Sequence, residues 1–355
     1  MANLGVIEGF YGSFYNIEQR HSLCKFIKER GYNFYIYAPK NDGKLRSHWD
    51  VSNDLCRYDS LKDIALNCTK LNLDFGIGLS PLKVTYDYQK EKRKFFLKTV
   101  ENLCKSTKCS IFSLLFDDVK LQSNDIGQIQ NEIISDVMNI LPDFVKTFIV
   151  CPSYYTFDPL LDKIFGSCPK TYFDDLTEKI DSDVSFFWTG NKVLSPDITK
   201  DDLKKANSLF KRKVFLWDNY PVNDGKKISQ FLYTKAFNGR FGIEDLTKGH
   251  AVNPMNEPTL SQIALLTLPL IYNNLSTSDI EAQRLRYIES LFNENTDTIL
   301  SFFDEVLKKG LDNLDIDYKT KIIKLCSKYT DSQYTEIKDF LNNVYIFDPN
   351  YPDTE

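Results

Sequence analysis

The feature that most constrains the fold is a regular alternation of short apolar runs with longer amphipathic stretches, which starts near the first residue. The apolar runs have the length and residue types of buried strands. The strongest of them, Ser110–Phe116, is almost continuously apolar, as is typical of a parallel strand that is covered on both faces. The predicted strands are Asn3–Glu8, Tyr32–Ala38, Asp74–Leu79, Ser110–Phe116, Lys146–Val150, Val184–Phe187, Lys213–Leu216 and Gly249–Val252.

Helices are expected between these strands, because the intervening stretches carry apolar residues at helical spacing. The predicted helices include Ile17–Arg30, Leu61–Leu71, Tyr86–Lys105, Asp125–Ile140 and Thr259–Leu268. Eight strand–helix alternations in about 270 residues match the number and length of a (β/α)8 barrel. An open doubly wound sheet normally uses fewer strands and a glycine-rich phosphate loop, and this sequence has no such loop. We therefore predict an α/β fold, a (β/α)8 TIM barrel.

The character of the sequence changes after Asn273. The stretches Ile280–Leu311 and Tyr318–Val344 carry Ile, Leu, Phe and Tyr at helical spacing. Ser278 and Glu281 have the spacing of a capping box at the start of a helix. These two stretches are therefore expected to form helices.

These patterns predict two parts, a barrel over residues 1–273 and a small helical appendage over residues 274–355. The final segment, residues 348–355, is polar and contains proline, so we expect it to be loose. The appended helices could form a homodimer or simply cover the surface of the barrel. The sequence does not decide between these arrangements.

The composition argues against nucleic acid and membrane as partners. The 44 Lys and Arg residues are balanced by 49 Asp and Glu residues, for a formal net charge of −5. Such a chain offers no basic face for nucleic acid or anionic lipid. No run approaches the roughly 18 apolar residues of a membrane span. The N-terminus has neither a basic segment nor a long apolar stretch, so we expect no signal peptide and a cytoplasmic location.

Cysteine and histidine usage indicates neither a disulfide scaffold nor a metal site. The 8 cysteines are dilute in 355 residues and form no CxxC pair, so we expect mostly buried thiols in a reducing compartment. The 3 histidines, His21, His48 and His250, lie far apart and in no metal-binding motif. We therefore predict neither a metal nor a cofactor.

Unusual polar and aromatic residues gather where the predicted strands end. In a barrel of this type the active site lies at that edge. These strand-end groups include Gly9, Lys40, Asp117, Asp118, Cys151, Tyr155, Trp188, Trp217, Asn219 and Asn253. The sequence therefore predicts an active site built from several loops.

Asp117 and Asp118 follow an apolar strand directly, and they are the best candidates for catalysis. Repulsion between neighbouring carboxylates, together with partial desolvation, raises the pKa of at least one of them. This arrangement suits a protonated acid beside an ionised partner. Two other interpretations remain at this point: a helix cap or solvated loop, and a Mg²⁺ site. No further acidic cluster or phosphate loop supports the magnesium site.

An ordered set of motifs resembles family 84 glycoside hydrolases, the O-GlcNAcases and their bacterial relatives. The motifs are GVIEGFYG, YAPKNDGKLR, GLSP, LLFDDV, CPSYY, FWTG, WDNYPVND and NPMNEP. They extend over roughly Gly5–Leu268. The sequence departs from the family pattern at Asn41, where many relatives carry a second Asp, and at Phe14-Tyr15, which replaces the usual Pro-Trp. Neither departure touches the aspartate pair.

The resemblance implies a retaining exo-β-N-acetylglucosaminidase that acts by substrate-assisted catalysis through an oxazoline. Asp117 would orient the 2-acetamido group, and Asp118 would protonate the leaving oxygen and then activate water. The resemblance also implies a set of substrate-binding residues: Tyr155, Trp217 and Asn219 for the acetamido group, Cys151 for its methyl group, and Gly9, Lys40, Asp224 and Asn253 for sugar hydroxyls. The implied substrate is a protein or small glycoconjugate that carries terminal β-linked N-acetylglucosamine (GlcNAc).

Each of these residues also has a structural interpretation. Tyr155 could be a core tyrosine, Asn219 and Asp224 could be turn residues, and for Trp188 we favour packing. His250 is most simply a loop or core residue, and Glu8 is expected to form a structural ion pair. At the level of function, a catalytically inactive GlcNAc-binding lectin and an endo-acting, hyaluronidase-type enzyme are the alternatives.

Overall fold

Parallel strands close into a barrel in the computed structural model, which describes residues 3–121 and 123–344. Each strand pairs with the next along the chain, and the first pairs with the last, through Leu4 opposite His250. The strands are β1 (Leu4–Glu8), β2 (Phe34–Tyr37), β3 (Asp74–Leu79), β4 (Ile111–Leu115), β5 (Thr147–Cys151), β6 (Ser185–Trp188), β7 (Phe215–Asp218) and β8 (Gly249–Val252). The predicted (β/α)8 TIM barrel is therefore confirmed.

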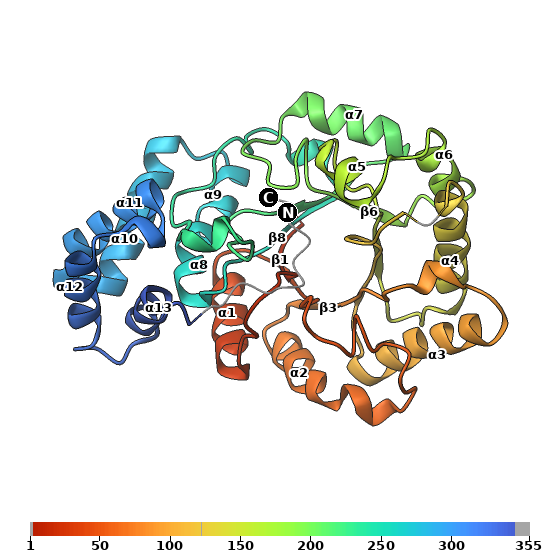
Figure 1. The fold of residues 1–355 in the computed structure, drawn as a ribbon, viewed down its shortest axis with the longest axis horizontal. Helices are drawn as coiled ribbons and strands as arrows, with labels where there is room; N and C mark the ends of the chain where they lie inside the picture. The colour runs from red at the N-terminus through yellow and green to blue at the C-terminus, as the bar shows by residue number, and fades with distance from the viewer. Residues whose placement is uncertain (1–2, 122, 345–355) are drawn as a thin grey trace.

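Helices surround this barrel (Figure 1). They are α1 (Ile17–Glu29), α2 (Lys62–Lys70), α3 (Lys90–Thr107), α4 (Ile126–Ile140), α5 (Leu160–Phe165), α6 (Tyr172–Thr177), α7 (Lys200–Phe210), α8 (Pro258–Leu265) and α9 (Leu268–Tyr272). Short 3-10 turns lie in the loops at Leu55–Leu61, Val84–Tyr86, Ile228–Gln230 and Glu244–Leu246. Within the described part of the chain, no helix is both long and apolar enough to cross a membrane.

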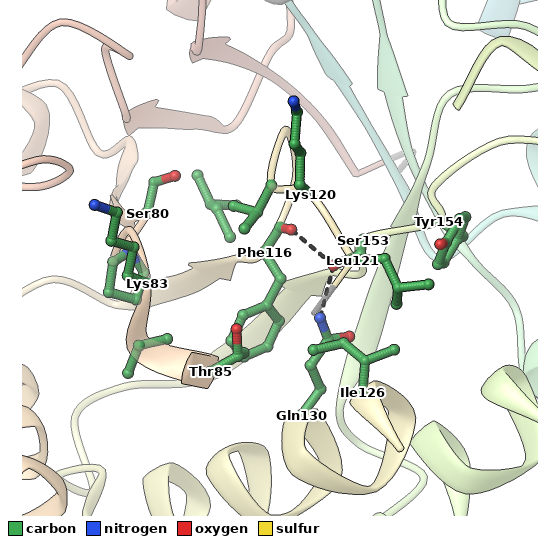
Figure 2. Close-up of a pocket in the computed structure, with 14 residues that line it drawn as sticks. Ser80, Lys83, Thr85, Phe116, Lys120, Leu121, Ile126, Gln130, Ser153 and Tyr154 are labelled. Atoms are coloured by element: carbon green, nitrogen blue, oxygen red, sulfur yellow. Dashed lines mark hydrogen bonds between the residues drawn. The ribbon is translucent and has the colours of Figure 1, made fainter. Parts of the chain in front are cut away.

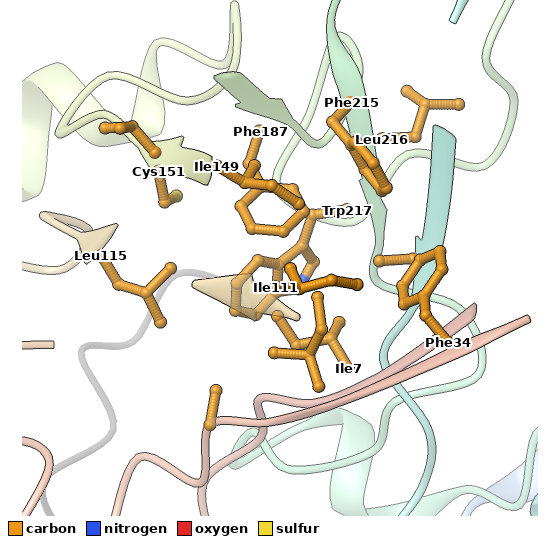
Figure 3. Close-up of a cluster of buried hydrophobic side chains, with 14 of the residues drawn as sticks. Ile7, Phe34, Ile111, Leu115, Ile149, Cys151, Phe187, Phe215, Leu216 and Trp217 are labelled. Atoms are coloured by element: carbon orange, nitrogen blue, oxygen red, sulfur yellow. The ribbon is translucent and has the colours of Figure 1, made fainter. Parts of the chain in front are cut away.

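The centre of the barrel is a packed core rather than a channel. Ile7 on β1, Ile149 on β5 and Phe187 on β6 are fully buried, and Phe215 on β7 is nearly so. Figure 3 shows side chains from several strands converging on this core. Edge-to-face contacts between the rings of Phe187 and Phe215, with centroids 5.5 Å apart, add to the burial. The core closes the barrel below its carboxyl edge, so a ligand can enter only from the loops.

Most predicted elements lie within two residues of the observed ones, and the main differences have local causes. The predicted seventh strand, Lys213–Leu216, begins and ends two residues too early, because Trp217 and Asp218 still belong to β7. The helix predicted from Tyr86 begins at Lys90, because Tyr86 belongs to a 3-10 turn.

The helix predicted over Thr259–Leu268 is divided into α8 and α9. Pro269 stands at the start of α9 and has no N–H with which to continue the preceding helix. The break therefore follows from a residue that the sequence prediction did not weigh.

Within the described residues, four further helices follow the barrel at the left of Figure 1, and two of them, α10 and α13, contact α8. They are α10 (Thr277–Phe292), α11 (Thr296–Lys309), α12 (Ile316–Cys326) and α13 (Ser332–Leu341). Leu260 and Ile263 of α8 belong to the same buried cluster as Phe302 of α11, so these helices share their core with a barrel helix. The division at residue 273 stays a prediction, and residues 348–355, predicted to be loose, lie outside the described residues.

The predicted capping box at Ser278 and Glu281 is wrong. The N-cap of α10 is Ser276, whose side chain accepts a hydrogen bond of 3.2 Å from the Asp279 backbone N–H. The helix therefore starts two residues earlier than the pattern indicated. Both serines fit the N-cap preference, so the choice between them was made by the path of the chain after α9.

One buried glutamate joins α13 to the barrel, and a second stands just before α8 within the barrel. Glu336 of α13 accepts hydrogen bonds from the backbone N–H groups of Thr259 (2.9 Å) and Leu260 (2.8 Å), so a side chain of the appendage caps α8. Glu257, just before α8, accepts a hydrogen bond of 2.9 Å from Asn223. Burial raises the pKa of Glu257 to about 8 and that of Glu336 to about 7. Both groups therefore retain protons in the native state at pH values where the unfolded chain has lost them.

This difference predicts that folding stability depends on the protonation of Glu257. The native state holds more protons than the unfolded state between the ordinary glutamate pKa of 4.5 and the raised pKa of about 8, so the free energy of unfolding falls as the pH rises through this window. Glu257→Gln should remove the part of this loss that Glu257 causes. Between pH 5 and pH 8 the free energy of unfolding of the variant should therefore fall by on the order of 2–4 kcal/mol less than that of the parent protein.

Urea denaturation of both proteins between pH 5 and pH 9 measures the effect. Glu18→Gln, on the exposed face of α1, is the matched control and should leave the pH dependence unchanged. An identical pH dependence in Glu257→Gln and the parent protein would contradict the prediction.

Candidate active site

A cavity of about 470 Å³, measured with its open mouth, lies at the carboxyl ends of the barrel strands. Its lining residues are Gly9, Tyr11, Lys40, Asp117, Asp118, Cys151, Tyr155, Thr189, Val193, Leu194, Trp217, Asn219, Val222, Asp224 and Asn253. Every residue that the sequence predicted for catalysis or substrate binding is among them. The structure therefore brings the complete predicted set together in one place, although the roles of its members stay predictions.

Asp117 lies at the end of β4 and is paired with Lys40 from the end of β2. The ammonium group of Lys40 forms a buried ion pair with Asp117 Oδ2 and lies 5.4 Å from the centre of the Trp217 ring. The other carboxylate oxygen, Asp117 Oδ1, is buried and has no hydrogen-bond partner among the described residues. A buried carboxylate oxygen without a donor is costly, so this position favours a ligand that brings an N–H or O–H group.

Asp118 is held between two tyrosine hydroxyls. Tyr11 donates a hydrogen bond of 2.8 Å to Asp118 Oδ2, and Tyr155 donates one of 3.1 Å to Oδ1. Burial and the neighbouring charge of Asp117 raise the pKa of Asp118, as the sequence predicted for one member of the pair. Burial also raises the pKa values of Tyr11 and Tyr155, so both phenols stay protonated and act as donors.

The backbone explains how two successive aspartates both reach the cavity. Asp118 has a φ of 60°, in the left-handed region, so the chain turns sharply just after Asp117. Aspartate is among the residues that tolerate this region best. Neither residue caps a helix, since α4 begins at Ile126 after Asp125. The helix-cap interpretation of the pair is therefore wrong.

One wall of the cavity is a hydrogen-bonded group from β1, β7 and β8. Trp217 Nε1 donates to Asn219 Oδ1 (2.9 Å), and Asn253 Nδ2 donates to the same oxygen (3.0 Å). The backbone N–H of Gly9 donates to Asn253 Oδ1 (3.2 Å). A Cβ atom on Gly9 would come within 2.3 Å of the Trp217 ring, so the indole can lie here only because this residue is glycine.

Asp224 and Cys151 complete the predicted set. Asp224 Oδ2 accepts a hydrogen bond of 2.7 Å from the backbone N–H of Tyr11, which joins the loop after β7 to the loop after β1. Cys151, at the end of β5, is buried. Burial, together with the charge of Asp117, raises the pKa of its thiol, so the thiol is neutral and presents an apolar surface to the cavity.

Sequence reasoning missed five lining residues: Tyr11, Thr189, Val193, Leu194 and Val222. Tyr11 could have been found, because it stands in the same glycine-rich strand-end motif as Gly9. Val222 stands inside the WDNYPVND motif and could also have been found, whereas nothing in the local sequence of Val193 and Leu194 distinguishes them from core positions.

The structure also shows the surroundings of Glu8 and Trp188, for which structural roles were predicted. Glu8 forms a buried ion pair of 2.7 Å with Arg20 of α1, which confirms the expected pairing. Trp188 is fully buried and packs edge-to-face on Phe157 and Phe210, as favoured. These groups lie outside the cavity lining.

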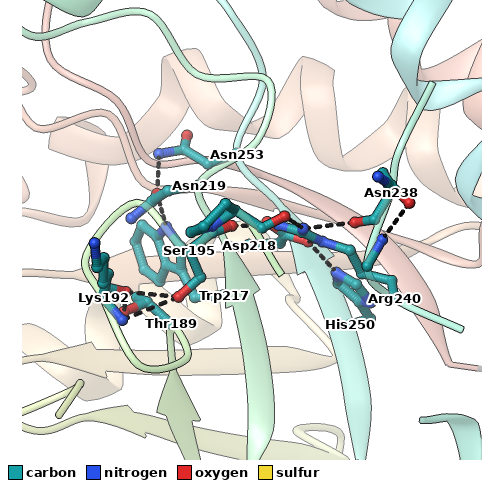
Figure 4. Close-up of polar contacts among 12 residues, drawn as sticks. Thr189, Lys192, Ser195, Trp217, Asp218, Asn219, Asn238, Arg240, His250 and Asn253 are labelled. Atoms are coloured by element: carbon teal, nitrogen blue, oxygen red, sulfur yellow. Dashed lines mark hydrogen bonds and ion pairs between the residues drawn. The ribbon is translucent and has the colours of Figure 1, made fainter. Parts of the chain in front are cut away.

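A polar network behind the cavity wall fixes the end of β7. Asp218 accepts hydrogen bonds from Arg240 Nε (2.9 Å) and Arg240 Nη2 (2.8 Å), and its Oδ2 lies 3.0 Å from His250 Nε2 (Figure 4). Burial alone would raise the pKa of Asp218, but Arg240 and His250 together hold it well below its usual range. Arg240 also donates to the carbonyl oxygens of Ser195 and Pro196, so it ties the loop after β6 to β7.

A second cavity is lined in part by the loop that follows Asp118, through Lys120 and Leu121 (Figure 2). Lys83 and Lys120 line it, and Ser153 bridges its wall by donating to the Phe116 carbonyl (3.0 Å) while accepting from Gln130 (2.7 Å). Its lining includes no carboxylate. This second cavity therefore offers no paired-carboxylate chemistry.

The cavity has the groups for acid–base chemistry on a small uncharged ligand. An acid with a raised pKa stands beside a carboxylate that is paired with a lysine, and aromatic and amide groups form the opposite wall. The described residues include no group of three or more His, Cys, Asp or Glu side chains that could hold a metal ion.

Comparisons with a family model and with known proteins identify the same family. The model of the beta-N-acetylglucosaminidase family matches residues 4–304. The Protein O-GlcNAcase of Rattus norvegicus is 28% identical over 280 residues, which are 76% of this chain and 30% of the rat protein. The chain thus spans less than a third of the length of this relative.

Two solved structures share the fold. A mutant of the Thermobaculum terrenum O-GlcNAc hydrolase has a TM-score of 0.74 and 21% identity, covering 95% of this chain and 80% of that chain. CpGH84B has a TM-score of 0.74 and 24% identity, covering 95% of this chain and 66% of that chain. At these identities the likeness extends to the fold alone.

Removing Arg240 from the network in Figure 4 should lower folding stability strongly. Arg240→Met would leave the buried Asp218 carboxylate without its main counter-charge, and it should lower the free energy of unfolding by about 3–5 kcal/mol. Lys235→Met is the control, because Lys235 and its partner Asp304 form an exposed ion pair of 2.5 Å that is worth at most about 1 kcal/mol. Denaturant titration at pH 7 measures both variants. Equal, small losses in the two would show that the Asp218 charge does not depend on Arg240.

Proposed function

This chain belongs to the beta-N-acetylglucosaminidase family of glycoside hydrolases, and from this premise we propose that it is a retaining, exo-acting β-N-acetylglucosaminidase. The substrate is a terminal β-linked GlcNAc residue on a protein or a small glycoconjugate. The reaction is substrate-assisted, because the acetamido group of the sugar itself supplies the nucleophile.

One observation supports this proposal above the others: the two oxygens of Asp117 are in different states. Oδ2 is paired with Lys40, while Oδ1 is buried without a partner among the described residues. The N–H of a 2-acetamido group is a donor that suits Oδ1. By accepting this hydrogen bond, an ionised Asp117 orients the acetamido oxygen and stabilises the positive charge that develops on the group.

Asp118 supplies the proton transfers in both steps. In the first step the acetamido oxygen forms a bond to the anomeric carbon, the glycosidic bond breaks, and the Asp118 carboxyl gives its proton to the leaving oxygen. The product is a protonated bicyclic oxazoline, whose N–H stays hydrogen-bonded to the ionised Asp117. In the second step Asp118, now ionised, takes a proton from water as the water oxygen attacks the anomeric carbon, and the ring opens to give GlcNAc with retained configuration.

The raised pKa of Asp118 supports this assignment, because an acid that works near neutral pH must keep its proton there. The tyrosine hydroxyls on its two oxygens restrict the carboxyl to one orientation. Tyr11 and Tyr155 both remain donors, so they also stabilise the ionised form that the second step requires.

The aromatic and amide side of the cavity forms the acetamido pocket. Trp217 and Tyr155 provide apolar ring faces, Asn219 provides an amide, and the neutral thiol of Cys151 faces the methyl group. The remaining predicted residues, Gly9, Lys40, Asp224 and Asn253, also line the cavity, and in the proposal they bind sugar hydroxyls.

One prediction of the proposed mechanism concerns the acid, Asp118. Asp118→Asn should lower kcat/KM for an alkyl GlcNAc glycoside by roughly 10²–10⁴-fold, because the leaving oxygen must then depart without a proton. The loss should be smaller for a dinitrophenyl glycoside, whose leaving group needs little protonation. Asp125→Asn, at the exposed start of α4, is the control and should retain the parent rate. Full activity of Asp118→Asn on the alkyl substrate would remove the acid assignment.

The second prediction concerns the acetamido group as nucleophile. Aryl GlcNAc should be hydrolysed more than about 10³-fold faster than aryl glucoside, because the glucoside lacks the group that attacks. A thiazoline mimic of the oxazoline should inhibit competitively. Equal turnover of both sugars, with no inhibition by the thiazoline, would exclude the mechanism.

The same assays separate the two alternative functions. A GlcNAc-binding lectin would bind the thiazoline or the free sugar and release no aglycone from any substrate. An endo-acting, hyaluronidase-type enzyme would shorten the polymer internally and release little monosaccharide. A GlcNAc-modified protein assayed beside the aryl substrate identifies the aglycone.

A further inference from the structure

Arg46 is a buried cation near the proposed acid that the mechanism above does not use. It lies on the loop after β2, six residues beyond Lys40, and only 8% of its surface is exposed. Its Nη1 donates to Ser80 Oγ (2.6 Å), and its Nη2 donates to Tyr11 Oη (3.1 Å). The guanidinium carbon lies 5.6 Å from the centre of the Tyr11 ring. A cation is costly to bury, so its position calls for an electrostatic explanation.

The Tyr11 hydroxyl connects Arg46 to Asp118. This oxygen accepts a hydrogen bond from Arg46 Nη2 (3.1 Å) and donates one to Asp118 Oδ2 (2.8 Å). Because Arg46 Nη2 and Asp118 Oδ2 bond to the same oxygen, these two atoms lie at most about 6 Å apart. A guanidinium that donates to a phenol oxygen polarises its O–H bond, and the phenol then becomes a stronger donor to the carboxylate.

The other groups that face Asp118 come from four strand ends. Asp117 at the end of β4 repels its charge, while Lys40 at the end of β2 attracts it. Tyr155, beyond β5, donates to it, and the thiol of Cys151 on β5 stays neutral. The remaining acid in the cavity is Asp224, whose carboxylate accepts from the Tyr11 backbone.

Lys40 and Arg46 therefore act differently. The ammonium group of Lys40 is bonded directly to Asp117, so much of its charge is neutralised there. The cation of Arg46 reaches Asp118 through a hydroxyl that both groups share. Burial and Asp117 raise the pKa of Asp118, and the charges of Lys40 and Arg46 oppose this rise.

We propose that Arg46 is a positioning residue that acts through the Tyr11 hydroxyl to hold the Asp118 carboxyl in place and to keep its ionised form accessible during turnover. The inference rests on the proposed function, because only a group that is first an acid and then a base must be protonated and ionised within one cycle. Burial beside Asp117 favours the protonated form of Asp118, and the charge of Arg46 favours the ionised form that the second step requires.

The test is the pH profile of a variant that keeps the size of the side chain and loses its charge. In the parent enzyme the basic limb of kcat/KM reports the loss of the Asp118 proton. Arg46→Met should move this limb to higher pH by about one to two units, since a unit charge within about 6 Å has an effect of this size at an effective dielectric constant of about 20. An unchanged limb in a folded Arg46→Met protein would overturn the proposal.

Two further variants separate charge from packing. Arg46→Lys keeps a positive charge, so its basic limb should stay within about half a unit of the parent even if kcat falls. Tyr11→Phe removes the shared hydroxyl and should also raise the limb. The same upward shift in Arg46→Lys as in Arg46→Met would overturn the electrostatic role, and the lysine and phenylalanine variants keep the proposal testable if the methionine variant does not fold.

Arg212→Met is the matched control. Arg212 is partly buried at the opposite end of the barrel and donates to the carbonyl oxygens of Ile180, Asp181 and Val184. Its loss should lower stability without moving the pH profile. A comparable shift of the limb in Arg212→Met would mean that the profile reports general loosening rather than Arg46.

A measurement without turnover distinguishes failure of this inference from failure of the proposed function. The carboxyl resonance of Asp118 in protein labelled with ¹³C-aspartate, identified by its loss in Asp118→Asn, can be titrated directly by NMR. The midpoint should lie about one to two units higher in Arg46→Met than in the parent. If the protein hydrolyses no GlcNAc substrate but this shift is present, the proposed function is wrong and the coupling is real. If the midpoints coincide, the coupling is wrong.

Discussion

Two carboxylates on successive residues, in a cavity with little access to water, are the constraint on which the site depends. Without compensation their charges repel strongly, because the surroundings screen them poorly. The two carboxylates have different partners: Lys40 pairs with Asp117, while Asp118 accepts hydrogen bonds from two phenol groups. The two groups therefore differ in environment although they are neighbours in the chain. That difference is what allows one to be an acid while the other stays ionised.

The support for this arrangement lies behind the cavity. Asp218 and Trp217 are adjacent on β7 and face opposite ways: the indole lines the cavity, and the carboxylate is held by Arg240. Arg240 reaches the loop after β6 as well, so one side chain fixes two of the cavity walls. At β1 the pair Glu8 and Arg20 ties the strand to α1. Buried ion pairs of this kind add little net stability but hold the loops in one arrangement.

The helices beyond the barrel are attached by hydrogen bonds to buried glutamates and by apolar packing. Glu336 of α13 caps the first turn of α8, and Glu257 at the start of α8 accepts from Asn223, the residue before Asp224. A continuous chain of contacts thus runs from the appended helices to the wall of the cavity. Because α8 shares its buried face with α11 through Leu260 and its neighbours, these helices act as a cover for barrel surface. This contact explains why a strongly apolar α8 is compatible with an outer position on the barrel.

The sequence by itself determined the barrel and the composition of the site. Alternating periodicity indicated the strands, the rule that barrel sites lie at strand ends grouped residues such as Gly9 and Asn253, and the family resemblance added Asp224. The structure has all of them in one cavity. The sequence could not supply Tyr11 as a partner of Asp118, nor Arg46 as a partner of Tyr11. Such contacts join loops that are distant in the chain. Only closure of the barrel brings them within hydrogen-bonding distance, and only burial in that closed form gives adjacent, chemically identical carboxylates different surroundings and so different chemistry.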